Sequence, residues 1–315
     1  MRALVTGAAG FVGSHLVEAL VARGDTVLAV DSFTPYYDVA QKQANAAALV
    51  GPAVEVVDAD LRVAVIPPML DGIDVVFHQS AQPGVRLSWS SGFREYVEQN
   101  VIVTQRLLDA VHVAGARRFV YASSSSVYGH QARYPTREDD LPAPFSPYGV
   151  TKLAAEHLCG VYSANWGLPT VALRYFTVFG PRQRPDMSIY RLCESALGRG
   201  AFPRYGDGAQ IREFTYVSDI VAGNLAASVA DLAPGATVNL AGGAEITLAD
   251  LIVLVGDLAG APVVVEARPA EPGDSRRNGG AVERARELLG WDPRVSLRDG
   301  IAAQLAWHRA RLAST

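Results

Sequence analysis

A glycine-rich turn close to the first residue limits the fold of this chain more than any other feature. The turn, Gly7-Ala-Ala-Gly10-Phe-Val-Gly13, lies between an apolar run at residues 3–6 and an amphipathic stretch at residues 11–22. This order predicts a strand, a tight turn and a helix. Glycines let the backbone approach a ligand closely, and the N-terminus of a helix attracts anions. We therefore expect a phosphate-binding turn at the edge of a parallel sheet.

Short apolar runs alternate with amphipathic stretches through the first half of the chain. The strand-like runs are residues 3–6, 26–30, 54–57, 75–78, 119–122 and 170–174, and helix-like stretches include residues 11–22, 93–114 and 148–166. β-branched strands separated by helices are typical of a parallel sheet that is covered on both faces. The pattern predicts an α/β fold, a doubly wound parallel (Rossmann) sheet with a smaller C-terminal α/β domain for a substrate.

The pattern loosens after about residue 175, where the pieces are shorter and richer in glycine and proline. Helices are expected around residues 188–198, 218–230, 248–258 and 281–289, whereas residues 43–48 are merely alanine-rich. We expect residues 1–174 and about 215–240 to form the sheet domain. About 175–214 and 241–315 are then expected to form the smaller domain.

Composition excludes several classes of function. The chain has 315 residues, of which 49% are hydrophobic and 19% charged, as in a globular protein with a sizeable core. Its net charge of -4 favours neither a nucleic acid nor a membrane surface as partner. No signal peptide is expected, because a strand pattern starts at once, so a cytoplasmic location is the default. Cys159 and Cys193 match no metal or redox spacing, and no metal is expected.

The second strand ends in Asp31, about 20 residues after the glycine turn, where a carboxylate can accept hydrogen bonds from both hydroxyls of an adenosine ribose. The same carboxylate would repel a 2′-phosphate, which favours NAD over NADP. Asp60-Leu61, after the third strand, could lie by the adenine, although capping of a loop explains Asp60 nearly as well. Ser80 lies at the end of the fourth strand, where a ligand crevice should open. The expected cofactor-binding residues are Gly7, Gly10, Phe11, Val12, Gly13, Asp31, Asp60, Leu61, Ser80 and Lys152.

The chain contains two lysines, Lys42 and Lys152, among 28 lysines and arginines, and Lys152 lies four residues after Tyr148. Residues four apart share one face of a helix. An ammonium beside a phenol should lower the phenol pKa, and a fall of about 3 units would make Tyr148 a proton acceptor near neutrality. The spacing alone is also common on solvated helix faces, so it leaves both interpretations open.

Serines follow the fifth strand, in Ser124-Ser125-Ser126-Val-Tyr128-Gly129, and here the chain resembles the extended short-chain dehydrogenase/reductase family, specifically its nucleotide-sugar epimerases and dehydratases. The resemblance also rests on the glycine turn, Asp31, Asp60-Leu61 and Tyr148-x-x-x-Lys152. Two later segments add to it, Leu173-Arg-Tyr-Phe-Thr177-Val-Phe-Gly-Pro181 and Arg212-Glu-Phe-Thr-Tyr-Val-Ser-Asp219.

The resemblance implies an enzyme that uses NAD transiently. Tyr148, as a phenolate helped by Ser124, would take the proton of the sugar 4-hydroxyl while hydride leaves C4. Lys152 would hold the nicotinamide ribose and keep Tyr148 acidic. The 4-keto sugar would then turn over and take hydride back on its other face.

Three segments resemble the UDP-glucuronate 4-epimerase branch: Asp31-Ser-Phe-Thr-Pro-Tyr-Tyr-Asp38, Ala81-Gln-Pro-Gly-Val-Arg86 and Gly180-Pro-Arg182-Gln-Arg184-Pro-Asp-Met187. Relatives that eliminate water or CO2 carry an acid where this chain has Ser125 and Ser126. We expect Ser125, Ser126 and Thr177 to hold the uronate carboxylate, with charge added by Arg86 or Arg184. The resemblance puts Arg212 on the diphosphate, and Asp274 and Arg276 in a segment that closes over the nucleotide or, equally well, in surface ion pairs.

Alternatives remain at this stage. One is a UDP-glucose/UDP-galactose 4-epimerase, although such enzymes usually carry asparagine where Thr177 stands. A second is a UDP-glucuronate decarboxylase, and a third is a non-catalytic NAD-sensing regulator. Homodimers are usual among the relatives, and they pack through two helices that correspond here to residues 93–114 and 148–166.

Overall fold

A parallel sheet of seven strands forms the centre of the protein. The computed structural model describes residues 1–49, 51–131, 133–269 and 277–313. The strand order is β10-β6-β5-β4-β1-β2-β3, and every neighbouring pair is parallel. The strands are β1 (Arg2–Thr6), β2 (Thr26–Asp31), β3 (Val54–Asp58), β4 (Val75–His78), β5 (Arg118–Ser124), β6 (Thr170–Tyr175) and β10 (Ala236–Leu240). The order reverses direction at β1 and β4, so a crevice opens beyond their carboxyl ends.

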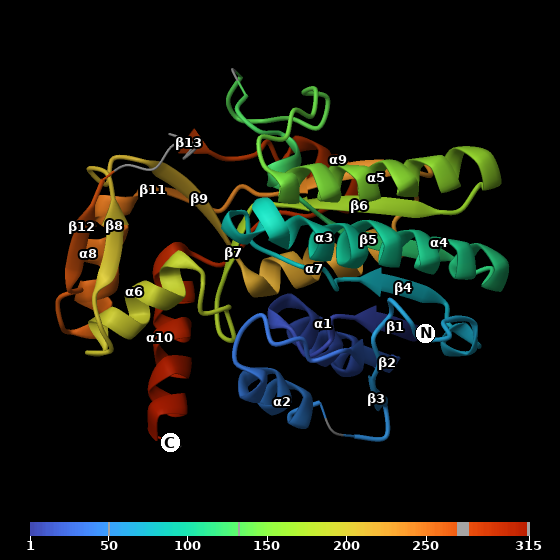
Figure 1. Cartoon of the computed structure of the whole chain (residues 1–315), viewed down its shortest axis with the longest axis horizontal. Coiled ribbons are helices and arrows are strands. Elements are labelled where there is room, and N and C mark those ends of the chain that lie inside the picture. Colours follow the sequence, from blue (N-terminus) through green and yellow to red (C-terminus); the bar gives the residue numbers. More distant parts are fainter. Residues whose placement is uncertain (50, 132, 270–276, 314–315) are drawn as a thin grey trace.

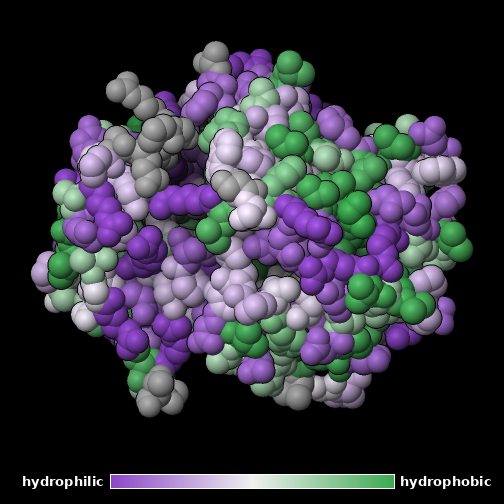
Figure 2. Space-filling view, in the orientation of Figure 1, coloured by the Kyte–Doolittle hydropathy of each residue, from purple (hydrophilic) through white to green (hydrophobic). Residues whose placement is uncertain are grey.

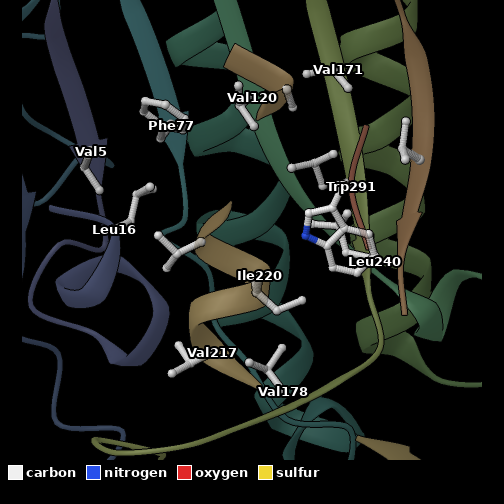
Figure 3. Packing of buried hydrophobic residues seen from close by; sticks show 14 of the residues in the cluster. Val5, Leu16, Phe77, Val120, Val171, Val178, Val217, Ile220, Leu240 and Trp291 are labelled. Carbon is white, nitrogen blue, oxygen red and sulfur yellow. The ribbon is translucent and has the colours of Figure 1, made fainter. Parts of the chain in front are cut away.

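Helices cover both faces of this sheet, because successive side chains of each strand point to opposite sides. Val5 of β1 packs in a core with α1 (Phe11–Ala22) and α7 (Val217–Val229), and Figure 3 shows it near Leu16, with Phe77 and Ile220 in the same cluster. The adjacent Leu4 packs in a second core with α4 (Val103–Ala114) and α5 (Pro147–Trp166). The remaining helices near the sheet are α2 (Val39–Ala47), α3 (Phe93–Tyr96), the π-helix η4 (Val97–Ile102) and α9 (Glu283–Leu289).

Two smaller sheets lie at one end of the large sheet, on the left in Figure 1, with α6 (Ser188–Ala196), α8 (Leu248–Ala259) and α10 (Leu297–Ala313). One sheet contains β7 (Thr177–Phe179), β9 (Ile211–Tyr216), β11 (Ala244–Thr247) and β13 (Arg277–Asn278), and the other pairs β8 (Phe202–Tyr205) with β12 (Val265–Arg268). A third core joins them to the three helices. Short 3-10 helices are Pro67–Leu70, Arg86–Ser88, Ser90–Gly92 and Ser125–Val127.

The predicted α/β fold with a doubly wound parallel sheet is confirmed. α1 and β4 have the predicted bounds, and the other five predicted strands lengthen by one to three residues. α2 was not among the predicted helices, because its buried residues Gln41, Lys42 and Asn45 are polar and give no apolar period. The helix expected at 281–289 begins only at Glu283. Within the part of the chain described, none of the helices is long and apolar enough to cross a membrane.

Candidate active site

The glycine turn forms a bare cradle between β1 and α1. Gly7 has φ +69°, and a Cβ there would lie 2.8 Å from the backbone nitrogen of Ser80. A Cβ on Gly13 would lie 2.1 Å from the carbonyl oxygen of Gly7. The N-cap residue of α1 is Gly10, which supplies no side chain to cap the helix. The glycines therefore let the backbone pack closely at the positive end of α1, and because Gly7, Gly10 and Gly13 line a cleft, the turn fits a pyrophosphate.

Asp31 is held in place at the end of β2. One carboxylate oxygen accepts a hydrogen bond from the Ala9 backbone N–H at 3.0 Å and the other from the Phe33 N–H at 2.8 Å. The Lys42 ammonium lies 3.9 Å away and donates to the Thr34 hydroxyl at 3.1 Å. Burial lowers the pKa of Lys42, while the charge of Asp31 opposes the fall. Sequence reasoning gave Lys42 no role, because α2 itself was not expected.

One cleft runs from the cradle to the fifth strand. It is lined by most of the expected cofactor residues, Gly7, Gly10, Phe11, Val12, Gly13, Asp31, Leu61, Ser80 and Lys152, together with Tyr36, Lys42, Tyr148 and Arg184. Asp60 turns to Arg62 instead, at 2.8 Å, and accepts the Arg62 backbone N–H at 2.9 Å. This contact matches the loop-capping alternative for Asp60.

Tyr148 and Lys152 lie one turn apart on α5, at the bottom of this cleft. Lys152 is only 3% exposed, and its Nζ lies 4.4 Å from the centre of the Tyr121 ring. Burial raises the pKa of Tyr148, while a hydrogen bond with Ser124 and the charge of Arg184 oppose the rise. The expectation that Lys152 lowers the pKa of Tyr148 was wrong for the protein alone, because burial dominates. Burial also lowers the pKa of Lys152 itself to about 7, which weakens its charge near neutrality.

Asn100, within the π-helix η4, links Gln82 in the wall of the first cleft to α5, the helix that carries Tyr148 and Lys152. Its side chain accepts the Gln82 backbone N–H at 2.7 Å and donates to the Gln82 carbonyl at 3.2 Å and to the Thr151 hydroxyl at 3.0 Å. π-helical turns often mark functional sites. Sequence reasoning missed this residue because residues 93–114 were expected to form one regular helix. The available signal was an asparagine at a position of that helix where the period calls for an apolar residue.

A second cleft adjoins the first, and Tyr36 lines both. It contains Arg86, Arg191 and Arg212 among the aromatic residues Phe202, Tyr205 and Phe214. The Arg86 guanidinium lies 4.7 Å from the centre of the Tyr205 ring. Arg86 thus lies with Arg212, at the end expected to hold the diphosphate, and Arg191 was not foreseen.

The other residues expected at the uronate carboxylate do not line one common cleft. Arg184 lines the first cleft and forms a bidentate ion pair with Asp186, in which Nε and Nη2 each donate to one carboxylate oxygen at 3.0 Å. Ser125 and Ser126 follow β5 and line a neighbouring hollow that Arg277 also borders. Thr177 begins β7, opposite Phe214. Asp274 and Arg276 lie outside the described residues.

Comparison with known proteins agrees with this arrangement. Residues 3–241 match the model of the NAD dependent epimerase/dehydratase family. The chain belongs to this family. A UDP-glucuronate 4-epimerase of Thermodesulfobacterium geofontis is 32% identical to the chain over 319 residues, which cover 98% of the chain and 96% of that protein. An uncharacterised UDP-glucose epimerase of Bacillus subtilis, YtcB, is 38% identical over 309 residues, 98% of each chain.

Among solved structures, the UDP-glucuronic acid 4-epimerase of Bacillus cereus in complex with UDP-glucuronic acid and NAD matches this member of the epimerase/dehydratase family with a TM-score of 0.94. It is 38% identical, and the match covers 99% of this chain and 100% of the other. The predicted relationship to the extended short-chain dehydrogenase/reductase epimerases, and with it the prediction of NAD as cofactor, is confirmed.

Proposed function

We propose that this chain interconverts UDP-glucuronate and UDP-galacturonate by transient oxidation at C4. The observation that carries the proposal is one cleft in which a phosphate cradle, Tyr148, Lys152 and a cationic Arg184 all meet. The Bacillus cereus relative, whose structure contains UDP-glucuronic acid and NAD, supports the choice of sugar.

In this proposal the N–H groups of the glycine turn bind the cofactor pyrophosphate, and Asp31 binds the adenosine ribose. NAD supplies the hydride acceptor. Tyr148 takes the proton of the 4-hydroxyl, Ser124 orients that hydroxyl, and Lys152 binds the nicotinamide ribose. Arg184 stabilises the phenolate of Tyr148, since its charge opposes the rise in the pKa of that residue that burial causes.

The substrate is held from both ends. Arg86, Arg191 and Arg212 bind the diphosphate by charge-assisted hydrogen bonds. Arg184, Thr177, Ser125 and Ser126 bind the carboxylate as cationic or neutral donors. Because Ser125 and Ser126 are not acidic, the site has no carboxylic acid at the positions where relatives that eliminate water or CO2 carry one.

The proposal includes a homodimer built on α3, α4 and α5. Figure 2 shows hydrophobic side chains gathered in the region of these helices. Exposed ones are Phe93, Ile102, Val113, Val150, Val161 and Trp166. A cytoplasmic enzyme agrees with Cys159 and Cys193, which are buried and free. The division into domains at about residues 174, 215 and 240 is part of the same proposal, since β10 joins the large sheet and β7 and β9 the small one.

The test is incubation of the NAD-loaded protein with UDP-glucuronate, UDP-galacturonate and UDP-glucose, with products separated by chromatography and CO2 measured. We expect both uronates to reach one equilibrium mixture without CO2, and Tyr148→Phe to bind both ligands without turnover. Turnover of UDP-glucose alone would establish the second candidate, which the similarity to the Bacillus subtilis protein favours. Release of CO2 would establish a decarboxylase.

A further inference from the structure

Glu156 is a buried carboxylate on α5 that the mechanism above does not use. Its side chain is 6% exposed and that of its partner Arg174 is 4% exposed. The Arg174 Nε donates to one carboxylate oxygen at 3.0 Å, and Nη2 contacts the other. The Ser123 hydroxyl donates to the first oxygen at 2.7 Å. One carboxylate therefore joins α5 to both β5 and β6.

These contacts lie where the proposed catalytic residues emerge. Ser123 directly precedes Ser124 and pairs with Arg174 in the sheet. Glu156 follows Lys152 by four residues and Tyr148 by eight, so all three lie on one face of α5. Fixing Glu156 to the sheet therefore fixes the rotation of α5 that turns Tyr148 toward Ser124.

Arg174 extends the anchor on the far side. Its Nη1 donates to the Tyr128 hydroxyl at 2.8 Å, and that hydroxyl donates to Asn239 on β10 at 2.7 Å. A buried ion pair of this kind holds its position because each partner would otherwise be an uncompensated charge. The Glu156–Arg174 pair is thus part of the protein core.

The charge of Glu156 also acts on Lys152. The groups that face Lys152 are Tyr121 on β5, His78 on β4, and Cys159 and Glu156 on α5. Burial raises the pKa of Cys159 and lowers that of His78 to about 3, so both are neutral near pH 7. The negative charge near Lys152 at that pH is therefore the carboxylate of Glu156, which opposes the loss of the lysine proton.

We propose that Glu156 is a positioning residue of this site: held by Arg174 and Ser123, its carboxylate sets the face of α5 that carries Tyr148 and Lys152 against β5 and places a negative charge one turn from Lys152. Its catalytic part rests on the proposed function, whereas its effect on Lys152 does not.

The experiment compares the wild type with Glu156→Gln and with the double variant Glu156→Gln/Arg174→Met. The single variant leaves Arg174 buried without its counter-charge and is expected to unfold at a lower temperature. The double variant removes both charges and should restore thermal stability. Asp219→Asn is the control, because Asp219 is a buried carboxylate that accepts the Arg294 and Val295 N–H groups at 3.1 Å, outside both clefts.

The first readout is the pH dependence of amine labelling, measured by peptide mass spectrometry. The chain has two lysines, so Lys42 is an internal reference in the same sample. In Glu156→Gln, which removes the carboxylate charge and keeps the charge of Arg174, we expect the titration of Lys152 to move down by about one pH unit or more, and that of Lys42 and of the control to stay in place. An unchanged Lys152 titration would overturn the charge role.

The second readout is steady-state epimerisation. The double variant should lose at least about 10-fold in kcat with less than about 2-fold change in KM, because positioning acts on the reacting groups and not on substrate binding. Recovery of wild-type kcat together with stability would reduce Glu156 to a structural residue. If the wild type itself fails to epimerise any UDP-sugar, the proposed function is wrong, and the labelling result still decides the effect of Glu156 on Lys152.

Discussion

Replacing Lys152 by methionine should stabilise the nucleotide-free protein while abolishing turnover. Lys152 is 3% exposed, and burial lowers its pKa from 10.5 to about 7. That fall corresponds to about 5 kcal/mol against folding with a protonated lysine, an upper bound on the cost. Methionine fills a similar volume without a charge, so we expect a gain of at least about 2 kcal/mol below pH 7.

The pH dependence of this gain has a definite sign. Between pH 7 and 10.5 the unfolded chain binds the lysine proton more strongly than the folded chain does, so the stability of the wild type rises with pH. The advantage of Lys152→Met should therefore be largest below pH 7 and shrink as the pH approaches 10.5. Each kcal/mol corresponds to about 1.5 °C in the melting temperature of a chain of 315 residues, because the entropy of unfolding grows with chain length.

The assay is calorimetric or optical melting of protein stripped of nucleotide, at a series of pH values. Lys42→Met is the matched control, since Lys42 is buried as well but lies 3.9 Å from the Asp31 carboxylate. Its loss leaves that carboxylate without a counter-charge, so the control should not become more stable. A lower melting temperature for Lys152→Met at pH 6 would refute the reasoning, because it would show that the ammonium contributes more than its burial costs.

Three further substitutions test the site. Arg184→Met should lower kcat/KM for UDP-glucuronate about 10- to 100-fold more than for UDP-glucose, as a charge-assisted hydrogen bond contributes about 1.5–3 kcal/mol; equal losses would remove Arg184 from the carboxylate. Thr177→Val should reduce kcat/KM for the uronate about 5-fold, the effect of one neutral hydrogen bond, and leave the neutral sugar unchanged; a matching loss for UDP-glucose would contradict the assignment. Gly13→Ala should abolish NAD binding in a calorimetric titration, because the added methyl would lie 2.1 Å from the Gly7 carbonyl oxygen; retained affinity would show that the cradle is not the cofactor site.

Five strands of the large sheet, β1, β2, β4, β5 and β6, could be predicted because they are buried on both sides and read as continuous apolar runs. α1 was predicted with the correct bounds for a different reason: its apolar residues Leu16, Val17 and Leu20 recur at helical spacing and face the core. α2 could not be predicted from periodicity. Its buried face is Gln41, Lys42 and Asn45, and what holds it is hydrogen bonding, such as that from the Gln41 side chain to the Arg182 carbonyl at 3.1 Å.

The site was predictable where its residues follow directly from a strand or share a helix face, as with Asp31 and the Tyr148–Lys152 pair. The position of a residue could not be predicted where it lies on a loop that could place its side chain in either of two clefts. Arg86 and Arg184 were both candidates for the carboxylate, and the structure separates them, because Arg184 lines the first cleft whereas Arg86 packs on Tyr205 in the second. The direction of the pKa change at Tyr148 was also out of reach, because spacing reports neighbours but not burial.

One face of α5 carries two groups whose charged forms are disfavoured by burial, Tyr148 and Lys152, and one ion pair that holds the helix to the sheet, Glu156–Arg174. Burial disfavours both the phenolate of Tyr148 and the ammonium of Lys152, so this face gains little by lying against the sheet with its functional groups charged. The Glu156–Arg174 pair lies one turn further along α5. Moving α5 away from the sheet would separate these two buried charges, so the pair holds the helix in place. An arginine at position 152 would keep its charge without help, yet it is bulkier and its fork of donors suits a carboxylate better than a single hydroxyl. If Lys152 binds the nicotinamide ribose as proposed, a compact ammonium suits that contact better than a guanidinium, and the carboxylate of Glu156 one turn away favours the charged form.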